Sequence, residues 1–314
     1  MTDFDVIVYH NPCSDGMASL WCSTLCRNDF DKVKTIPCMA GEIGKIDLVL
    51  FTNKKILFVD MCPSYEILQV IKAEARLITI LDHHKTTFTM FNKYFDNNND
   101  KTKIAKMYNG IIFNLDMHRA GCQIAWDYFY PGTKRPWFID YIADRDLWLW
   151  QMPNSKAINT AMYDYNLLTL EGMNSMNLFS LEQIDELCIF GEQKVELFNK
   201  QVDNICKTAI EAKTSVNNTI YNIWLVTCGN KHKSDVGNKL SNTLFENGTC
   251  PDFTVIWQKD PYSDKYWISL RNIEGIDLSA LASQFAASGG GHERAAGFTL
   301  TNVHDIYDTF IPNK

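Results

Sequence analysis

The sequence predicts an α/β protein in which a parallel, doubly wound sheet is followed by a smaller C-terminal α/β domain. Short apolar runs alternate with helical patterns in the N-terminal part, which is typical of strands joined by crossover helices. A long amphipathic helix then separates this part from a segment rich in β-branched and aromatic residues. The 314 residues are long for one core and sufficient for two domains.

In the N-terminal part, each predicted strand ends at a residue able to bind a metal or to move a proton. The expected elements are, in order, a strand at 4–9, a turn cluster at 10–16, a helix at 17–27, a strand at 55–59, a helix at 65–76 and a strand at 77–81. The three strands end at His10, Asp60 and Asp82. Because the carboxyl ends of parallel strands meet at one edge of a sheet, we expect these side chains to lie close together.

A helical pattern begins near residue 180 and presents one apolar face. Its apolar residues are spaced 3, 4, 3 and 4 apart: Val195, Phe198, Val202, Ile205 and Ala209. Strands are expected beyond it at 219–228, 253–258 and 266–271, with a hairpin turn at 259–264. The expected organisation is a first domain at 1–190, a linking helix at 191–214 and a second domain at 215–314.

Composition restricts the class of protein. Apolar residues make up 46% of the chain and charged residues 21%, which is ordinary for a globular protein. The acidic N-terminus lacks the features of a signal peptide, no apolar run is long enough to span a membrane, and the ten cysteines include no CxxC pair. We therefore expect a cytoplasmic protein with reduced thiols and no membrane partner.

The net charge of −7 argues against an extended surface for long duplex nucleic acid, because tight non-specific binding needs many contacts between basic side chains and phosphates. An acidic enzyme can still bind a small anionic substrate if metal ions supply local positive charge. The expected partner is a short single-stranded RNA or DNA, or a small nucleotide. A homodimer and a monomer both remain open.

The first motif that carries chemistry is Asp82-His83-His84. It follows the apolar run at 77–81, where a strand would end. Imidazole and carboxylate together form a metal site of hard-to-intermediate character. The motif therefore predicts a metal site at the edge of the sheet.

The second motif is a glycine-rich loop near the C-terminus. Gly289, Gly290 and Gly291 are followed by His292 and Arg294. A bare glycine backbone can close on a phosphate, and the two side chains can contact its oxygens. Three glycines alone could form only a flexible turn, but their setting favours a phosphate-binding loop. Metal ligands and a phosphate-binding loop in one chain indicate phosphoester chemistry.

The order of these motifs resembles that of the DHH phosphoesterase superfamily, and the resemblance covers residues 6–299. The matching positions are His10, Asp15-Gly16, Asp60, Asp82-His83-His84, Asp144-Arg145-Asp146-Leu147-Trp148, Ser269-Leu270-Arg271 and the segment from Gly289 to Phe298. A lone DHH tripeptide is a weak signal, whereas this order of motifs is specific. In size and layout the chain is most similar to the compact oligoribonucleases (nanoRNases) and phosphoadenosine-phosphate phosphatases.

The resemblance implies two divalent metal ions, commonly Mn²⁺, with Mg²⁺, Co²⁺ and Zn²⁺ as alternatives. By motif position, His10 and Asp60 bind one ion, while Asp15, Asp60, His83 and an acidic residue of the fourth motif bind the other. Asp60 is then the bridging ligand, and a water shared by the ions attacks phosphorus.

Two further roles follow from the same resemblance. His84 contacts the substrate phosphate or donates a proton. Asp82 orients a ligand histidine by a hydrogen bond and does not bind the metal itself. In the catalytic set, His84, Asp60 and Asp82 are thus the residues expected to act at the reacting centre.

Two positions leave the ligand set open. Where many DHH proteins have an aspartate two residues before the one matched by Asp15, this chain has Cys13, a softer ligand that would favour zinc or cobalt if it binds metal at all. In the fourth motif, Asp144 and Asp146 could both reach the site or merely cap a helix. We favour Asp146, which directly precedes the Leu-Trp pair.

The resemblance implies hydrolysis of short oligonucleotides to mononucleotides. Arg271, the glycine loop and His292 are expected to hold a terminal phosphate in a cleft between the two domains. One alternative is a phosphatase of bisphosphorylated nucleotides, and another is a cyclic dinucleotide phosphodiesterase. A nucleotide-binding protein without catalysis is a further alternative, motivated by Cys13.

Overall fold

The computed structural model describes residues 3–26, 29–39, 41–92, 94 and 102–312. It divides into two compact units, Met1–Glu196 and Leu197–Lys314, which we call the first and the second unit. Each contains its own sheet and its own buried core. The described residues include no helix long and apolar enough to cross a membrane.

The first unit is built on a six-stranded sheet with the order β2-β1-β3-β4-β6-β5. Its strands are β1 (Val6–His10), β2 (Lys34–Cys38), β3 (Lys55–Val59), β4 (Leu77–Asp82), β5 (Lys103–Tyr108) and β6 (Ile111–Asp116). All neighbouring strands are parallel except β5, which pairs antiparallel with β6 at one edge. The predicted parallel sheet is confirmed.

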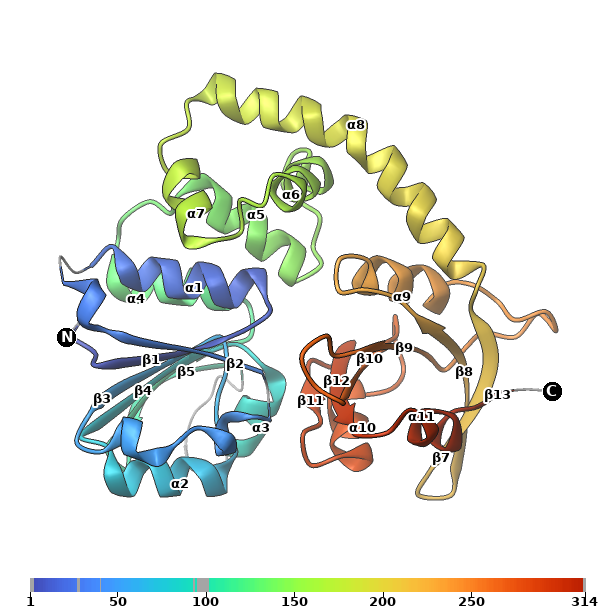
Figure 1. Cartoon of the computed structure of the whole chain (residues 1–314), viewed down its shortest axis with the longest axis horizontal. Coiled ribbons are helices and arrows are strands. Elements are labelled where there is room, and N and C mark those ends of the chain that lie inside the picture. Colours follow the sequence, from blue (N-terminus) through green and yellow to red (C-terminus); the bar gives the residue numbers. More distant parts are fainter. Residues whose placement is uncertain (1–2, 27–28, 40, 93, 95–101, 313–314) are drawn as a thin grey trace. The chain divides into compact units, whose positions relative to one another are not determined.

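Helices cover both faces of this sheet, as in a doubly wound fold (Figure 1). The first unit's α-helices are α1 (Ser14–Thr24), α2 (Tyr65–Glu74), α3 (Lys85–Asn92), α4 (Gly121–Phe129), α5 (Trp137–Asp146), α6 (Ser155–Asp164), α7 (Leu170–Met176) and the first part of α8 (Leu181–Cys206). Three short 3₁₀ helices lie at η1 (Phe30–Lys32), η2 (Ile43–Lys45) and η3 (Leu48–Phe51).

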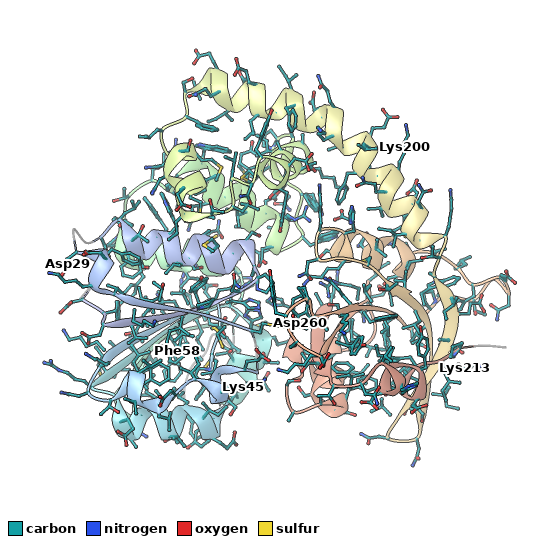
Figure 2. The ribbon with its side chains drawn as sticks, viewed as in Figure 1. Asp29, Lys45, Phe58, Lys200, Lys213 and Asp260 are labelled. Carbon is teal, nitrogen blue, oxygen red and sulfur yellow. The ribbon has the colours of Figure 1, made fainter. Side chains whose placement is uncertain are left out.

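Alternation along the strands explains why both faces are covered. In β3, Ile56 and Phe58 pack in the core beside α2 and α3, whereas Leu57 and Val59 pack in the core beside α1 and α4. All four side chains are fully buried. The side chain of Phe58 can be followed in Figure 2.

Helix α1 begins at Ser14, three residues before the predicted start of 17. The sequence was expected to turn through Gly16, but the chain already winds into a helix there, with Cys13 at the N-cap position. Gly16 makes this possible because a Cβ atom at this residue would lie 2.0 Å from the carbonyl oxygen of His10. The first turn of α1 therefore packs directly on the end of β1.

Helix α8 differs in extent from the predicted linking helix. It begins at Leu181, as the helical pattern from about residue 180 predicted, but it ends at Cys206, and residues 210–216 form strand β7 instead of helix. In that segment Ala212 and Thr214 are buried while their neighbours are not, which is the period of a strand. Phe198 and Val202 of the predicted apolar face are buried in a core of the second unit.

The second unit contains a seven-stranded sheet with the order β11-β12-β10-β9-β8-β7-β13. Its strands are β7 (Ile210–Val216), β8 (Thr219–Thr227), β9 (Phe253–Lys259), β10 (Tyr266–Arg271), β11 (Gly290–Gly291), β12 (Ala295–Leu300) and β13 (Ile311–Pro312), and its helices are α9 (Lys233–Ser241), α10 (Leu278–Phe285) and α11 (Val303–Thr309). Only β8 and β9 pair in parallel; the other pairs are antiparallel. The unit is therefore α/β, as expected.

Candidate metal centre and phosphate-binding loop

The candidate metal centre lies at the carboxyl edge of the first unit's sheet. Strands β1, β3 and β4 are neighbours, and they end at His10, directly before Asp60 and at Asp82. Asp60 has a left-handed backbone with a φ of 55°, and its N–H donates to the carbonyl of Leu81 at 2.9 Å. A buried aspartate in this conformation is uncommon and directs its carboxylate toward both neighbouring strands.

The two carboxylate oxygens of Asp60 face different histidines. Oδ2 lies 3.2 Å from Nδ1 of His10, and Oδ1 lies 3.1 Å from Nε2 of His83. Two sets of potential ligands share this residue, each with its atoms within 4.8 Å of one another: His10, Asp60 and His84 in one set, and Asp15, Asp60 and His83 in the other. The structure thus brings together the residues that the sequence motifs single out, with Asp60 between them.

Asp15 is held by the N-terminus of α4, which the sequence analysis did not identify. Its buried carboxylate accepts hydrogen bonds from the backbone N–H of Gly121 at 2.7 Å and of Cys122 at 2.8 Å. A Cβ atom at Gly121 would lie 2.8 Å from both Asp15 Oδ2 and Asp60 Cβ, so glycine is required for this close approach. The only sequence signal was a glycine at the start of an apolar helical pattern.

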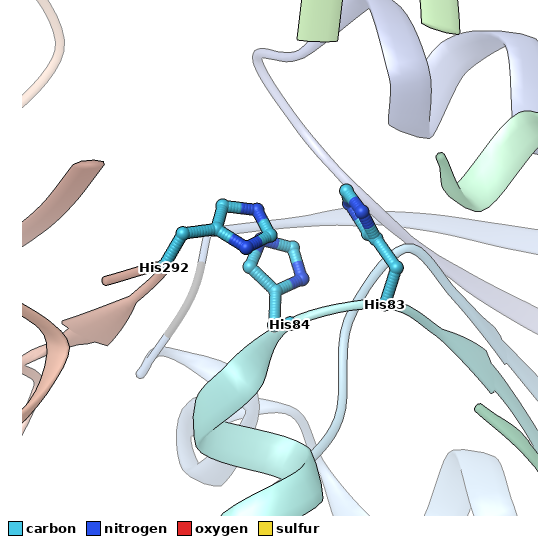
Figure 3. Close-up of side chains that lie close together, drawn as sticks. All are labelled: His83, His84 and His292. Atoms are coloured by element: carbon cyan, nitrogen blue, oxygen red, sulfur yellow. The ribbon is translucent and has the colours of Figure 1, made fainter. Parts of the chain in front are cut away.

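The two histidines after β4 have different surroundings. His83 is buried, and its Nε2 lies 3.5 Å from Asp15 Oδ2 and 3.5 Å from Asp146 Oδ2. His84 is 19% exposed, and its Nδ1 lies 2.7 Å from Asp82 Oδ1. Figure 3 draws both imidazoles where β4 ends and α3 begins.

Asp82 belongs to neither ligand set that includes Asp60, but it contacts both histidines that follow it. Its buried carboxylate accepts from the backbone N–H of His83 at 2.8 Å and from the hydroxyl of Thr87, in addition to its contact with His84. These bonds fix the turn that presents both histidines. Asp82 thus contacts His84 directly and holds the backbone of His83.

The structure separates the two acidic residues of the fourth motif. Asp146, the last residue of α5, lies against His83, and its buried Oδ2 has no hydrogen-bond partner among the described residues. Asp144 points elsewhere: its carboxylate accepts from the backbone N–H of Gln151 at 2.8 Å and of Met152 at 3.3 Å. Asp144 thus holds the loop after α5. Neither acidic residue belongs to the two ligand sets, but Asp146 lies 3.5 Å from His83 of the second set.

Cys13 lies at the N-cap of α1, near the carboxylates but outside both ligand sets of the described residues. It makes no side-chain capping bond to the helix. Burial raises the pKa of the Cys13 thiol well above its usual range, and the charges of Asp60, Asp146 and Asp15 raise it further. Without a cation nearby, the thiol is therefore neutral.

Electrostatics of the centre are dominated by crowded carboxylates. Burial raises the pKa of Asp15 well above its usual range, and Asp60 and Asp146 add to the effect. Burial also raises the pKa of Asp146. For Asp60, burial acts in the same direction, but hydrogen bonds from His10 and His83 outweigh it and hold the pKa well below its usual range.

His83 shows the complementary shift. Burial would lower its pKa, but the hydrogen bond to Asp60 and the charge of Asp146 raise it well above the usual value. A proton on His83 would balance part of the negative charge. Divalent cations would provide that balance more completely, and the donor set of imidazoles and carboxylates, with a buried unsatisfied oxygen on Asp146, fits them.

The glycine-rich loop lies at the β11–β12 turn of the second unit. Gly290 and Gly291 form β11, and the N–H of His292 donates to the carbonyl of Ala295 at 2.8 Å. Gly291 has a φ of 134°, and a Cβ atom at Gly289 would lie 2.0 Å from the carbonyl oxygen of Ala282. Glycine is thus required at 291 by the positive φ and at 289 by close packing on helix α10.

Arg271 ends β10, beside this turn. It pairs in register with Ala295 of β12, and the N–H of the following residue, Asn272, donates to the carbonyl of Arg294 at 3.3 Å. The side chain of Arg294 is exposed, whereas those of Arg271 and His292 are partly buried. The structure therefore places the predicted phosphate-binding residues of the second unit at one end of its sheet.

Comparison with known proteins identifies the family. The chain is 30% identical over 312 residues to the uncharacterised protein R106 of Acanthamoeba polyphaga mimivirus, covering 95% of this chain and 68% of that protein. The chain belongs to the same family as this mimivirus protein. No family model matches the sequence.

Solved structures with a similar arrangement come from several bacteria. RecJ from Thermus thermophilus, in complex with Mn²⁺, has a TM-score of 0.46 and 12% identity, covering 96% of this chain and 50% of RecJ. An exopolyphosphatase-related protein from Bacteroides fragilis has a TM-score of 0.43 and 13% identity, covering 98% and 90%. The pGpG-specific phosphodiesterase PggH from Vibrio cholerae has a TM-score of 0.40 and 12% identity, covering 96% and 95%.

Proposed function

We propose that this protein is a DHH-type phosphodiesterase that uses two divalent metal ions, Mn²⁺ in the first place, to hydrolyse short oligonucleotides to mononucleotides. The observation that carries the proposal is the position of Asp60 between two ligand sets, with one carboxylate oxygen facing each. A shared carboxylate is how proteins hold two cations close enough to act on one phosphate.

The contacts of the centre support the ligand roles that we propose. His10 and Asp60 would hold one ion, and Asp15, Asp60, His83 and Asp146 would hold the other. Asp15 is set in place by two backbone N–H donors, and the Oδ2 of Asp146 is buried and available to a cation. Asp144 and Cys13 are not needed as ligands in this arrangement.

The exposed side of the centre is where a phosphate can approach. His10 and His84 have 26% and 19% of their side chains exposed, whereas Asp15, Asp60 and His83 are almost fully buried. His84 is held by Asp82 through Nδ1, and we assign it the role of contacting the phosphate or protonating the leaving oxygen. When bound, the ions would lower the pKa of a water and neutralise the charge that grows on the phosphate.

The second unit contributes phosphate binding. Arg271 offers a guanidinium for two phosphate oxygens, and strand β11 (Gly290–Gly291) with the following His292 lies at the same end of the sheet. We assign a terminal phosphate of the substrate to these residues. A net charge of −7 favours a short strand or small nucleotide over a long duplex.

A substrate panel tests the proposal. The protein is assayed with Mn²⁺ on a dinucleotide, a five-residue RNA, the DNA of the same sequence, a bisphosphorylated adenosine and a cyclic dinucleotide. We expect the two short RNAs to be cut to mononucleotides fastest. Exclusive release of phosphate from the bisphosphorylated nucleotide, or exclusive opening of the cyclic one, would replace the proposed substrate with that compound.

The dependence on the centre is tested by Asp60→Ala. We expect activity to fall to background, because the variant loses a ligand of both ions, and we expect chelation of the parent to have the same effect. Asp31→Ala, which removes an exposed aspartate of the same unit, is the matched control and should keep parental activity. Unchanged turnover in Asp60→Ala would exclude the two-ion proposal.

A further inference from the structure

Helix α9 presents a face of small residues to strands β9 and β10. Ser234, Gly237 and Ser241 are spaced three and four apart, so they lie on one side of the helix. The two serines form hydrogen bonds with Arg271 of β10, and a Cβ atom at Gly237 would clash with the side chain of the same arginine. This is the arginine to which the proposed function assigns phosphate binding.

Gly237 is the residue that lets the arginine lie against the helix. A Cβ atom at this position would lie 2.4 Å from Cγ and 2.8 Å from Cβ of Arg271, and 2.9 Å from Cδ1 of Ile256. Glycine inside a helix is unfavourable compared with alanine, so helix formation alone does not explain it. The space that it leaves is filled by the stem of Arg271.

Ser234 bonds to the guanidinium of the arginine, and Ser241 bonds to its backbone. Ser234 Oγ accepts from Nη2 of Arg271 at 3.4 Å, and Ser241 Oγ donates to the backbone carbonyl of Arg271 at 2.9 Å. Ser241 also lies 3.1 Å from the hydroxyl of Thr254, the residue of β9 that pairs with Arg271. A further bond from Nη1 to the carbonyl of Leu270 limits the rotation of the guanidinium.

We infer that the small-residue face of α9 positions the guanidinium of Arg271 for phosphate binding, with Gly237 as its main determinant. The inference rests on the proposed function, because it takes Arg271 as the phosphate ligand. Gly237 is a positioning residue, since it acts through Arg271 and is not assigned a contact with substrate. A side chain at 237 would displace the stem of the arginine and move its guanidinium.

The test compares Gly237→Ala, Arg271→Ala and the double variant in the full chain. The probe is a 5′-phosphorylated diadenylate, and its affinity is measured by calorimetry in the presence of chelator. We expect Gly237→Ala and Arg271→Ala each to weaken binding about tenfold, as for loss of a charge-assisted hydrogen bond, and the double variant to bind no more weakly than Arg271→Ala.

Gly229→Ala is the matched control, because a Cβ atom at Gly229 meets no atom within 4 Å. It should bind as the parent does. With Mn²⁺, Gly237→Ala should raise KM and leave kcat nearly unchanged, which a general loss of folding would not do. If Gly237→Ala does not fold, Ser241→Ala replaces it. Ser241→Ala should weaken binding in the parent, but it should have no further effect when it is combined with Arg271→Ala.

The outcomes separate this inference from the proposed function. Parental binding by Gly237→Ala, or a loss that adds fully to that of Arg271→Ala, would overturn the positioning role and leave the proposed function intact. Parental binding by Arg271→Ala would instead remove the arginine from the proposed phosphate site. Cleavage of the substrate panel by the parent tests the proposed function independently of both.

Discussion

Asp60 is the residue on which the account depends most. It follows a buried strand, adopts a left-handed backbone and places its carboxylate between His10 and His83. A carboxylate would be costly to bury among other carboxylates without protons or cations nearby. Its two histidine contacts lower its pKa, whereas the pKa values of Asp15 and Asp146 are raised, so charge in the centre is unevenly distributed.

The raised pKa of Asp146 gives a prediction about stability. A raised pKa means that the folded protein binds the Asp146 proton more tightly than the unfolded chain does. As pH rises above the pKa of the unfolded state, the ionisation of Asp146 therefore destabilises the metal-free fold. At neutral pH, Asp146→Asn should therefore raise the melting temperature of the metal-stripped protein. It should also reduce the further rise that Mn²⁺ causes, since a ligand is lost. Calorimetric scans with and without Mn²⁺ measure both effects, and a lower melting temperature without metal would contradict the assignment.

Asp144 should behave in the opposite way. Its carboxylate is buried and accepts two backbone hydrogen bonds from the loop after α5. Asp144→Ala should lower the free energy of unfolding by about 2 kcal/mol, whether or not metal is present. Denaturant titration checks this value. A loss that appears only with Mn²⁺ would instead indicate that Asp144 is a ligand.

At the scale of elements, the sequence predicted the strands that carry the centre because their apolar runs are short, uninterrupted and bounded by polar residues. Residues 55–59 are β3 exactly as expected, and β4 matches 77–81 with Asp82 as its last residue. The neighbouring positions of β1, β3 and β4 explain why residues far apart in the chain meet.

Other parts of the centre could not be predicted from local patterns. The bond of Asp15 to Gly121 and Cys122 joins residues more than a hundred positions apart, and it depends on where α4 begins. The family resemblance favoured Asp146, but no local pattern predicted that Asp144 accepts hydrogen bonds from the loop after α5. Contacts between residues far apart in the chain leave no periodic pattern in the sequence from which they could be predicted.

The N-cap of α1 gives a prediction at the scale of elements. Cys13 occupies a position where aspartate caps a helix well, but its thiol makes no capping bond. Cys13→Asp would add a carboxylate beside Asp15, Asp60 and Asp146, so it should lower the stability of the metal-stripped protein and raise the affinity for Mn²⁺ relative to Zn²⁺. Competitive titration of the two metals measures the ratio. An unchanged ratio would show that position 13 is not a ligand even when it carries a carboxylate.

At the scale of the whole molecule, the chain combines one unit with a candidate metal centre and another with a candidate phosphate-binding turn. The mimivirus protein is 30% identical over a match that covers 95% of this chain, so the family extends across both units. The boundary between the units falls within the long helix α8, whose two ends pack in separate cores. The sequence predicted a helix between two domains, but the period of its apolar face did not define where it ends, because Ala209 continues the pattern beyond Cys206.

The binding stoichiometry of manganese decides whether Asp60 bridges two ions. Metal-stripped protein is titrated with Mn²⁺ by isothermal calorimetry, alongside Asp60→Ala and the Asp31→Ala control. We expect about two ions per parent chain and per control chain, and loss of both high-affinity sites in Asp60→Ala, because the Asp60 carboxylate would serve both ions. A single ion in the parent, or two ions retained at parental affinity in Asp60→Ala, would contradict the bridging role of Asp60.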